Sequence, residues 1–250
     1  MSIINTFDLT GEEIIAPSRV VGAIEGFPKT VLVVFTQKFA DLLMITMQPE
    51  QVCVMSAGRS VPVYKFTYQG KELGFYHTML GGAASAALLE EVIAMGAERF
   101  LFFGSCGALD KSITGGHLIV PTAAYRDEGA SYHYAPAADY IEIETAGKLA
   151  RIFDTMMVSY IRTKAWTTDG FYRETRRNTD ARKKEGCAVV EMECASVMAV
   201  GQFRKKEVYQ FLYAADCLDG DDWDQRILGN MPEDMRERIL KVALETAIRL

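Results

Sequence analysis

The sequence has few of the residues that build metal and redox sites. It contains three histidines, His77, His117 and His133, and five cysteines. No pair of them has the close spacing of a zinc ligand set or of a redox motif. We therefore expect no metal site, and we expect reduced thiols in a cytoplasmic protein.

The chain also lacks an excess of positive charge. The chain carries a formal net charge of −6, which argues against nucleic acid as a partner, because binding to a phosphate backbone needs a basic surface. Any small-anion site must then be a local arrangement of arginine, lysine and backbone N–H groups. The sequence has neither an apolar run long enough to cross a membrane nor the basic start of a signal peptide. We therefore expect no membrane association.

Apolar residues, in contrast, are plentiful. They make up 49% of the 250 residues, and short apolar runs alternate with helical patterns. The predicted strands cover residues 30–35, 52–55, 61–68, 73–78, 99–103, 117–120, 158–163, 189–190 and 209–215. The predicted helices cover residues 38–44, 83–95, 142–153, about 194–203 and 233–248. This alternation predicts one α/β domain over residues 1–250, with a mostly parallel sheet covered on both sides.

Two carboxylates follow one of the predicted strands. Val190 runs into Glu191, Met192 and Glu193, at a carboxyl end of the kind where open α/β sheets bind their ligands. Buried carboxylates need hydrogen-bond donors, and a ribose diol supplies two. The alternative interpretation is an acidic helix start, stabilised by the helix dipole.

Small residues mark two further candidate sites. Gly104, Ser105 and Gly107 follow a buried strand, and we expect a loop there whose backbone N–H groups form an anion nest. Gly81 and Gly82 precede a predicted helix and offer a similar N-terminal anion site. The alternative for both is a plain turn.

Two more segments are candidates for recognising a heterocyclic ring. Phe171 and Tyr172 offer flat surfaces for stacking, and Arg177 can donate to carbonyl oxygens; the alternative is a solvated charged loop with an aromatic anchor. Asp216 closes an apolar strand, where burial would raise its pKa and suit it to general acid catalysis. The alternative for Asp216 is a helix-capping or loop role.

Taken in order, these segments resemble the nucleoside phosphorylase family, and the uridine phosphorylases most closely. The resemblance implies a single α/β domain around a mixed sheet with a distorted barrel, flanked by helices. It also implies homo-oligomers that are dimers, or hexamers built from dimers. It also implies that an N-glycosidic bond is broken and the pentose is transferred to inorganic phosphate, the co-substrate, without a cofactor. The matching stretches are Phe103–Ala108, Asp127–Pro136, Thr168–Tyr172 and Val190–Glu193.

The resemblance also implies roles for single residues. For the sugar, Glu193 matches the carboxylate that binds the ribose hydroxyls, Met192 the residue under the sugar, and Glu191 the acid beside it. For the base, Phe171 matches the stacking aromatic. Two residues are candidates for assisting the leaving base: Arg177, as in uridine phosphorylases, and Asp216, as in purine-cleaving members.

For phosphate, the resemblance assigns Gly104 and Ser105 in the glycine-rich segment, and Arg59, which would reach the phosphate site of a neighbouring subunit. Two family arginines are missing. In the family the first strand normally ends in Pro-Gly-Asp-Pro-x-Arg. Here that place reads Val34–Phe39, which contains no glycine or arginine, and Phe102 stands where the second arginine is expected. Each charge-assisted hydrogen bond contributes about 1.5–3 kcal/mol, so these losses weaken anion binding.

The sequence therefore leaves alternatives open. One is a nucleoside hydrolase that uses water instead of phosphate, and another is a nucleoside-binding family member that has lost phosphorolysis. The base class is open as well, because Arg177 indicates a pyrimidine and Asp216 indicates a purine.

Overall fold

The computed structural model describes residues 2–55 and 59–250. The strands are β1 (Thr30–Val34), β2 (Glu50–Met55), β3 (Val61–Tyr68), β4 (Lys71–His77), β5 (Arg99–Ala108), β6 (Leu118–Asp127), β7 (Tyr140–Glu142), β8 (Tyr160–Thr168), β9 (Cys187–Glu191) and β10 (Glu207–Cys217). The helices are α1 (Pro17–Val20), α2 (Gln37–Met47), α3 (Gly82–Met95), α4 (Ala146–Thr155), α5 (Arg176–Lys184), α6 (Cys194–Phe203) and α7 (Glu233–Ala247). Short 3₁₀ helices lie at η1 (Ile3–Asn5), η2 (Ala130–His133) and η3 (Phe171–Arg173).

One sheet contains all ten strands, and part of it closes into a barrel. The order β10-β6-β8-β9-β5 returns to its start because β5 also pairs with β10, while β1, β4, β3 and β2 extend the sheet beyond β5. This arrangement confirms the mixed sheet with a barrel that the family resemblance implies. The mostly parallel sheet predicted from the alternation of elements is wrong, because five of the ten strand pairs are antiparallel. A closed barrel of this kind leaves no free edges among its own strands.

Strand β5 is the centre of the fold and is longer than predicted. It does not end at Phe103 but continues to Ala108, so the expected loop over Gly104, Ser105 and Gly107 is a strand. The small residues lie where β5 leaves the open sheet and enters the barrel, pairing with β10 on one side and β9 on the other. Backbone pairing there replaces the predicted anion nest.

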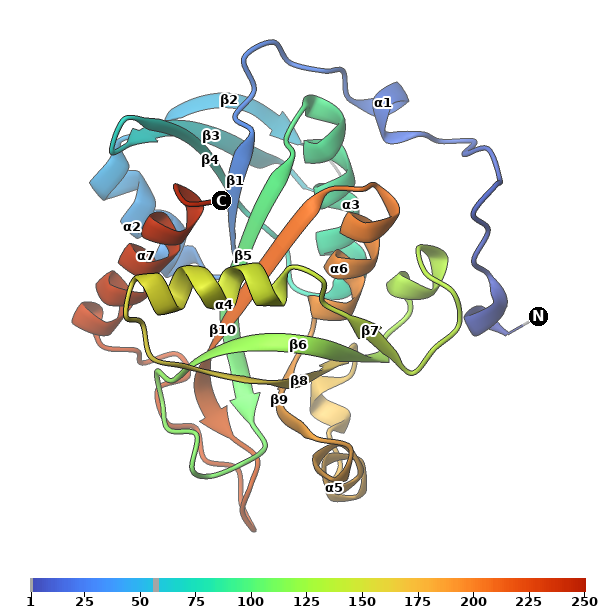
Figure 1. Cartoon of the computed structure of the whole chain (residues 1–250), viewed down its shortest axis with the longest axis vertical. Coiled ribbons are helices and arrows are strands. Elements are labelled where there is room, and N and C mark those ends of the chain that lie inside the picture. Colours follow the sequence, from blue (N-terminus) through green and yellow to red (C-terminus); the bar gives the residue numbers. More distant parts are fainter. Residues whose placement is uncertain (1, 56–58) are drawn as a thin grey trace.

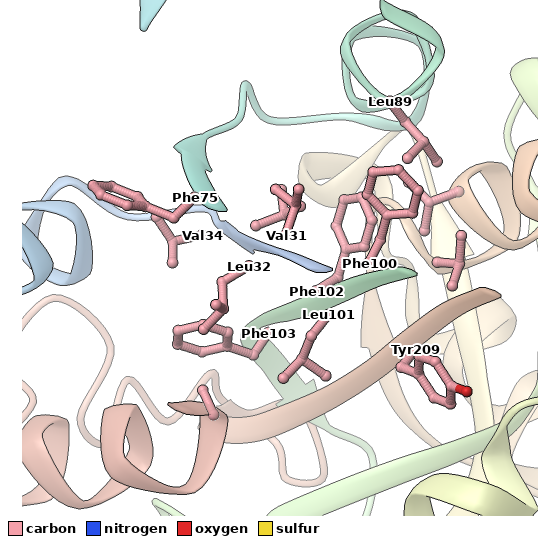
Figure 2. Packing of buried hydrophobic residues seen from close by; sticks show 14 of the residues in the cluster. Val31, Leu32, Val34, Phe75, Leu89, Phe100, Leu101, Phe102, Phe103 and Tyr209 are labelled. Carbon is pink, nitrogen blue, oxygen red and sulfur yellow. The ribbon is translucent and has the colours of Figure 1, made fainter. Parts of the chain in front are cut away.

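The hydrophobic core surrounds the first half of β5. All five residues of β1 are buried, as a central strand covered on both faces requires. Figure 2 shows side chains from β1, β4, β5, β10 and α3 packed together; the labelled ones are Val31, Leu32, Val34, Phe75, Leu89, Phe100, Leu101, Phe102, Phe103 and Tyr209. In Figure 1, α2 and α7 cover one side of this region and α3 and α6 the other.

Two predicted boundaries change for physical reasons. The helix predicted over residues 142–153 begins at Ala146, because residues Tyr140–Glu142 form β7 against β6. The charged loop predicted over residues 168–177 contains the start of α5. This helix has no apolar stripe that periodicity could detect, and its N-terminus is capped by the hydroxyl of Thr175, which accepts from the Asn178 N–H at 3.4 Å.

Across residues 2–55 and 59–250, the structure contains no helix with the length and apolar character needed to cross a bilayer.

A partly buried ion cluster fastens the N-terminal segment to the helices. Arg204, which ends α6, donates from Nε and from a terminal nitrogen to Glu90 of α3 at 2.7–2.9 Å, and to Glu13 at 2.5 Å. Glu90 is only 6% exposed, so its charge depends on Arg204 for compensation.

We expect Arg204→Met to lower the free energy of unfolding by about 3 kcal/mol, because it leaves Glu90 buried without its partner. Adding Glu90→Gln should recover part of this loss. The control is Arg238→Met, which breaks an exposed pair with Asp234 and should cost under about 1 kcal/mol. Urea denaturation measures all three, and equal losses for the two arginine variants would contradict the assignment.

Candidate active site

The barrel and the segments around its rim enclose a cavity of about 730 Å³, large enough for a small-molecule ligand. Its charged lining is strongly acidic, with five carboxylates and one arginine among the described residues. The lining residues are Phe35, Leu80, Gly104, Ser105, Cys106, Gly107, Phe171, Tyr172, Glu174, Arg176, Thr179, Val190, Glu191, Met192, Glu193, Gln210, Leu212, Asp216, Leu218, Asp222, Trp223 and Leu228.

Most of the residues predicted for the site therefore meet in one place. Glu191, Met192, Glu193, Phe171, Asp216, Gly104 and Ser105 all line the cavity, whereas Arg177 and Arg59 do not. These two arginines are exposed in this chain, Arg177 on α5 and Arg59 ahead of β3. Arg176 lines the cavity instead of its neighbour in sequence.

Glu191 and Glu193 are the two acids predicted to lie beside the sugar, and we call them the acidic pair. Glu191 accepts from the Thr167 hydroxyl at 2.5 Å and from the backbone N–H groups of Glu193 and Cys194 at 2.8 and 2.7 Å. It thus caps the N-terminus of α6, where helix N–H groups lack partners within the helix. The capping alternative raised by the sequence therefore applies to Glu191, although Glu191 also lines the cavity.

Glu193 is held differently. It accepts from the Gly81 N–H at 2.7 Å, so the glycine pair predicted as an anion site faces a carboxylate of the protein itself. Gly81 has φ of +97°, a conformation that favours glycine. Glu193 is 5% exposed, and the loop before α3 fixes its position against β9.

Burial makes both carboxyls weak acids. It raises the pKa of Glu191, against the hydrogen bonds from Thr167 and the backbone, and it raises the pKa of Glu193, with the nearby charge of Glu191 adding to the effect. Two buried carboxylates this close disfavour each other's ionised form. The pair is therefore poised to hold a proton in the neutral pH range.

A third carboxylate, missed by the sequence analysis, lies behind the pair. Glu128 is 8% exposed and accepts from the Ser196 hydroxyl of α6 at 2.5 Å and from the Ser131 N–H at 3.0 Å. Its only signal in the sequence is its place in the stretch Asp127–Pro136. Glu128 ties α6 to η2 and so stabilises the backbone that carries Glu193.

Another part of the cavity lining combines aromatic rings with acids. The ring centroids of Phe171 and Tyr172 lie 3.9 Å apart, and both side chains are exposed to solvent. Trp223 donates its indole N–H to Asp216 at 2.7 Å. Burial raises the pKa of Asp216, and the bond from Trp223 opposes the shift. We call the part of the cavity lining formed by Phe171, Tyr172, Glu174, Asp216 and Trp223 the aromatic end.

The guanidinium of Arg176 is partly occupied by bonds within the protein. Its guanidinium donates to the backbone carbonyls of Leu218 and Asp221 at 3.2 and 3.0 Å. These bonds attach α5 to the loop after β10. Arg176 thus builds the wall of the cavity and has fewer N–H groups left for binding an anion.

The glycines of β5 make close packing possible on the floor of the cavity. A Cβ atom on Gly104 would lie 2.7 Å from the Phe35 ring, so Phe35 covers this glycine. A Cβ atom on Gly107 would lie 2.6 Å from Leu218 and 3.0 Å from Val190. Phe35 belongs to the segment Val34–Phe39, which the sequence resemblance matched to the family's phosphate loop, and it brings an apolar ring there.

The acidic pair should make stability depend on pH. Because the pKa of Glu193 is raised to about 8 from about 4.3 in an unfolded chain, the folded state holds a proton that the unfolded state has lost. The free energy of unfolding should then decrease as pH rises from about 5 to 8. We expect Glu193→Gln to flatten this decrease in a series of Tm measurements without ligand. Glu72→Gln, which alters an exposed residue of β4, is the control, and a Glu193→Gln profile parallel to the unmodified protein would contradict the shift.

Comparison with known proteins gives this geometry a family context. The chain is 29% identical over 155 residues to a guanosine phosphorylase of Halorubrum lacusprofundi, covering 60% of this chain and 63% of that protein. It is 35% identical over 109 residues to a uridine phosphorylase of Thermococcus kodakarensis, covering 42% and 39%. Each match spans less than two thirds of the relative.

A solved structure shares the fold over nearly the whole chain. The purine nucleoside phosphorylase of Toxoplasma gondii, in complex with immucillin-H, superposes with a TM-score of 0.76 at 18% identity, covering 90% of this chain and 92% of that one. The family model described as the phosphorylase superfamily matches residues 29–249. The chain therefore belongs to the phosphorylase superfamily.

Proposed function

We propose that this protein cleaves the N-glycosidic bond of a ribonucleoside. The observation that carries the proposal is the buried carboxylate of Glu193, which lines a cavity together with aromatic rings and a second acid, Asp216. A nucleoside offers the matching groups, a diol on its sugar and a flat heterocycle as its base. Guanosine and uridine phosphorylases among the relatives support the same class of substrate.

In this proposal the sugar lies against Glu193 and Met192. The hydroxyls of the ribose donate to Glu193, and the thioether of Met192 packs under the ring. As the bond to the base breaks, positive charge develops on the sugar, and the nearby carboxylates stabilise it. Glu191 contributes through its charge, since its oxygens already accept from the protein.

Asp216 is the residue we propose for the leaving base. Its raised pKa suits an acid that shares a proton with a departing nitrogen. A purine takes such a proton on its five-membered ring. Arg177, the candidate for a pyrimidine carbonyl, does not line the cavity, so we propose a purine nucleoside instead of the uridine-like substrate indicated by the closest resemblance.

We propose phosphate as the acceptor of the pentose, as in the relatives, with Ser105 donating to it at Gly104. The missing cation would then be Arg59 of a second subunit, which makes the site dependent on a homo-oligomer. No other cofactor enters this scheme. We also propose that the enzyme acts in the cytoplasm, in nucleoside catabolism.

A second candidate, hydrolysis by water, is favoured by the acidity of the cavity. A phosphate dianion is repelled by carboxylates and needs cations or several N–H donors. Arg176 is engaged by backbone carbonyls, and Phe35 covers Gly104. Water has no such requirement. A family member that binds a nucleoside without cleaving it is the remaining alternative.

The deciding experiment is a panel of ribonucleosides incubated with and without phosphate, with products separated by chromatography. Ribose 1-phosphate formed only with phosphate supports phosphorolysis, and free ribose formed without it supports hydrolysis. If every nucleoside stays intact under both conditions, the proposed activity is wrong.

Glu193→Ala should reduce kcat/KM by roughly 10²–10³, because it removes one strong contact to the charge of the transition state. The control is Glu72→Ala on β4, with both variants checked for folding by circular dichroism. Activity near that of the unmodified protein would mean that Glu193 does not bind the sugar.

Asp216→Asn should reduce kcat on purine nucleosides by roughly tenfold or more, with a smaller effect on KM, because it removes a proton donor but keeps the shape. Arg177→Ala is the matched comparison and should have little effect. A strong loss for Arg177→Ala and none for Asp216→Asn would place a pyrimidine carbonyl, not a purine ring, beside these residues.

A further inference from the structure

Glu174 is the one carboxylate of the aromatic end that has no assigned task. It follows η3 directly and lines the cavity together with Phe171, Tyr172 and Asp216. Within the described part of the chain its backbone N–H donates to the Phe171 carbonyl at 3.4 Å, while its carboxylate forms no hydrogen bond or ion pair. Burial raises the pKa of Glu174 to about 7, and the charge of Asp216 adds to the shift.

This end of the cavity offers acceptors and few donors. Ionised carboxylates accept hydrogen bonds and donate none. The one arginine there, Arg176, donates to the carbonyls of Leu218 and Asp221, and the indole N–H of Trp223 donates to Asp216. A ligand group that pairs with the Glu174 carboxylate must therefore bring its own N–H donors.

We propose that Glu174 selects the base by accepting two parallel hydrogen bonds from a ring N–H and the adjacent exocyclic amino group, the donor edge of guanine. The inference rests on the proposed function and adds to it a specificity residue and a preferred base. Asp216 faces the five-membered ring in this arrangement, and the rings of Phe171 and Tyr172 cover the plane of the base.

The chemistry of the other bases explains the preference. Hypoxanthine has the ring N–H but lacks the amino group, so it offers Glu174 one bond instead of two. Uracil has a single N–H between two carbonyl oxygens, so the second oxygen of Glu174 would face a carbonyl oxygen instead of an amino group. An acceptor that a bound ligand shields from water but leaves without a partner is costly, so sites built on such bonds discriminate strongly.

The test compares kcat/KM for guanosine, inosine and uridine between the unmodified protein and Glu174→Gln, which keeps the shape but replaces one acceptor oxygen with a donor. We expect guanosine to exceed inosine by roughly tenfold or more, at about 10- to 100-fold per charge-assisted bond. The variant should bring this ratio close to one, mainly through loss with guanosine. Asp180→Asn, on the exposed side of α5, is the matched control and should keep the ratio.

A preference for uridine, or a guanosine to inosine ratio that Glu174→Gln leaves unchanged, would overturn the inference while the cleavage activity stands. If no nucleoside is cleaved, the proposed function fails, and the same comparison is then made by calorimetry. Guanosine binding that is tighter than inosine binding and is weakened by Glu174→Gln supports the inference, and equal affinities overturn it.

Discussion

The site depends on the backbone pairing of β5 with two different strands at Gly107. This residue lies opposite Val190 of β9 and opposite Asp216 of β10, and this double pairing closes the barrel. It also sets the distance between the ends of β9 and β10, and so between the acidic pair and Asp216. A side chain at this position would collide with Val190 and Leu218, which explains why a glycine stands in the middle of a buried strand.

The fold stabilises an unusual concentration of buried negative charge around this point. Each carboxylate near the sugar end has dedicated donors: backbone N–H groups of α6 and the Thr167 hydroxyl for Glu191, Gly81 for Glu193, and two serines for Glu128. Such bonds offset the cost of removing a carboxylate from water. For Glu191 and Glu193, the remaining unfavourable part is expressed as raised pKa values. These are properties that suit a site where positive charge develops on a bound sugar.

The segment that follows β1 brings an aromatic ring into the cavity of this fold. The fold is that of the superfamily, while Phe35 brings an aromatic ring to the segment that the sequence resemblance matched to a phosphate loop. Phe35 packs on Gly104 and near Phe102, so an aromatic ring lines the cavity beside Gly104.

The sequence by itself determined the local features. Alternating apolar runs predicted most strands and helices, and the stretches around Ser105, Phe171, Glu193 and Asp216 identified residues that do line one cavity. These patterns are short-range, because they depend on the spacing and chemistry of residues that are neighbours in the sequence. They also supported the family and its mixed sheet through resemblance, although periodicity alone indicated a mostly parallel one.

Only the tertiary structure decided which long side chains reach the cavity. Arg176 and Arg177 are adjacent and chemically identical, yet the turn of α5 directs one to the cavity wall and leaves the other outside. Glu174 and Glu128 carried no pattern of their own, because their surroundings come from strands and loops distant in the sequence. The continuation of β5 through Gly104, Ser105 and Gly107 likewise depended on its pairing with β10 on one side and β9 on the other. Periodicity in the sequence indicates which face of a helix or strand is apolar. The pairing and packing of elements distant in the sequence decide which residues that face contacts.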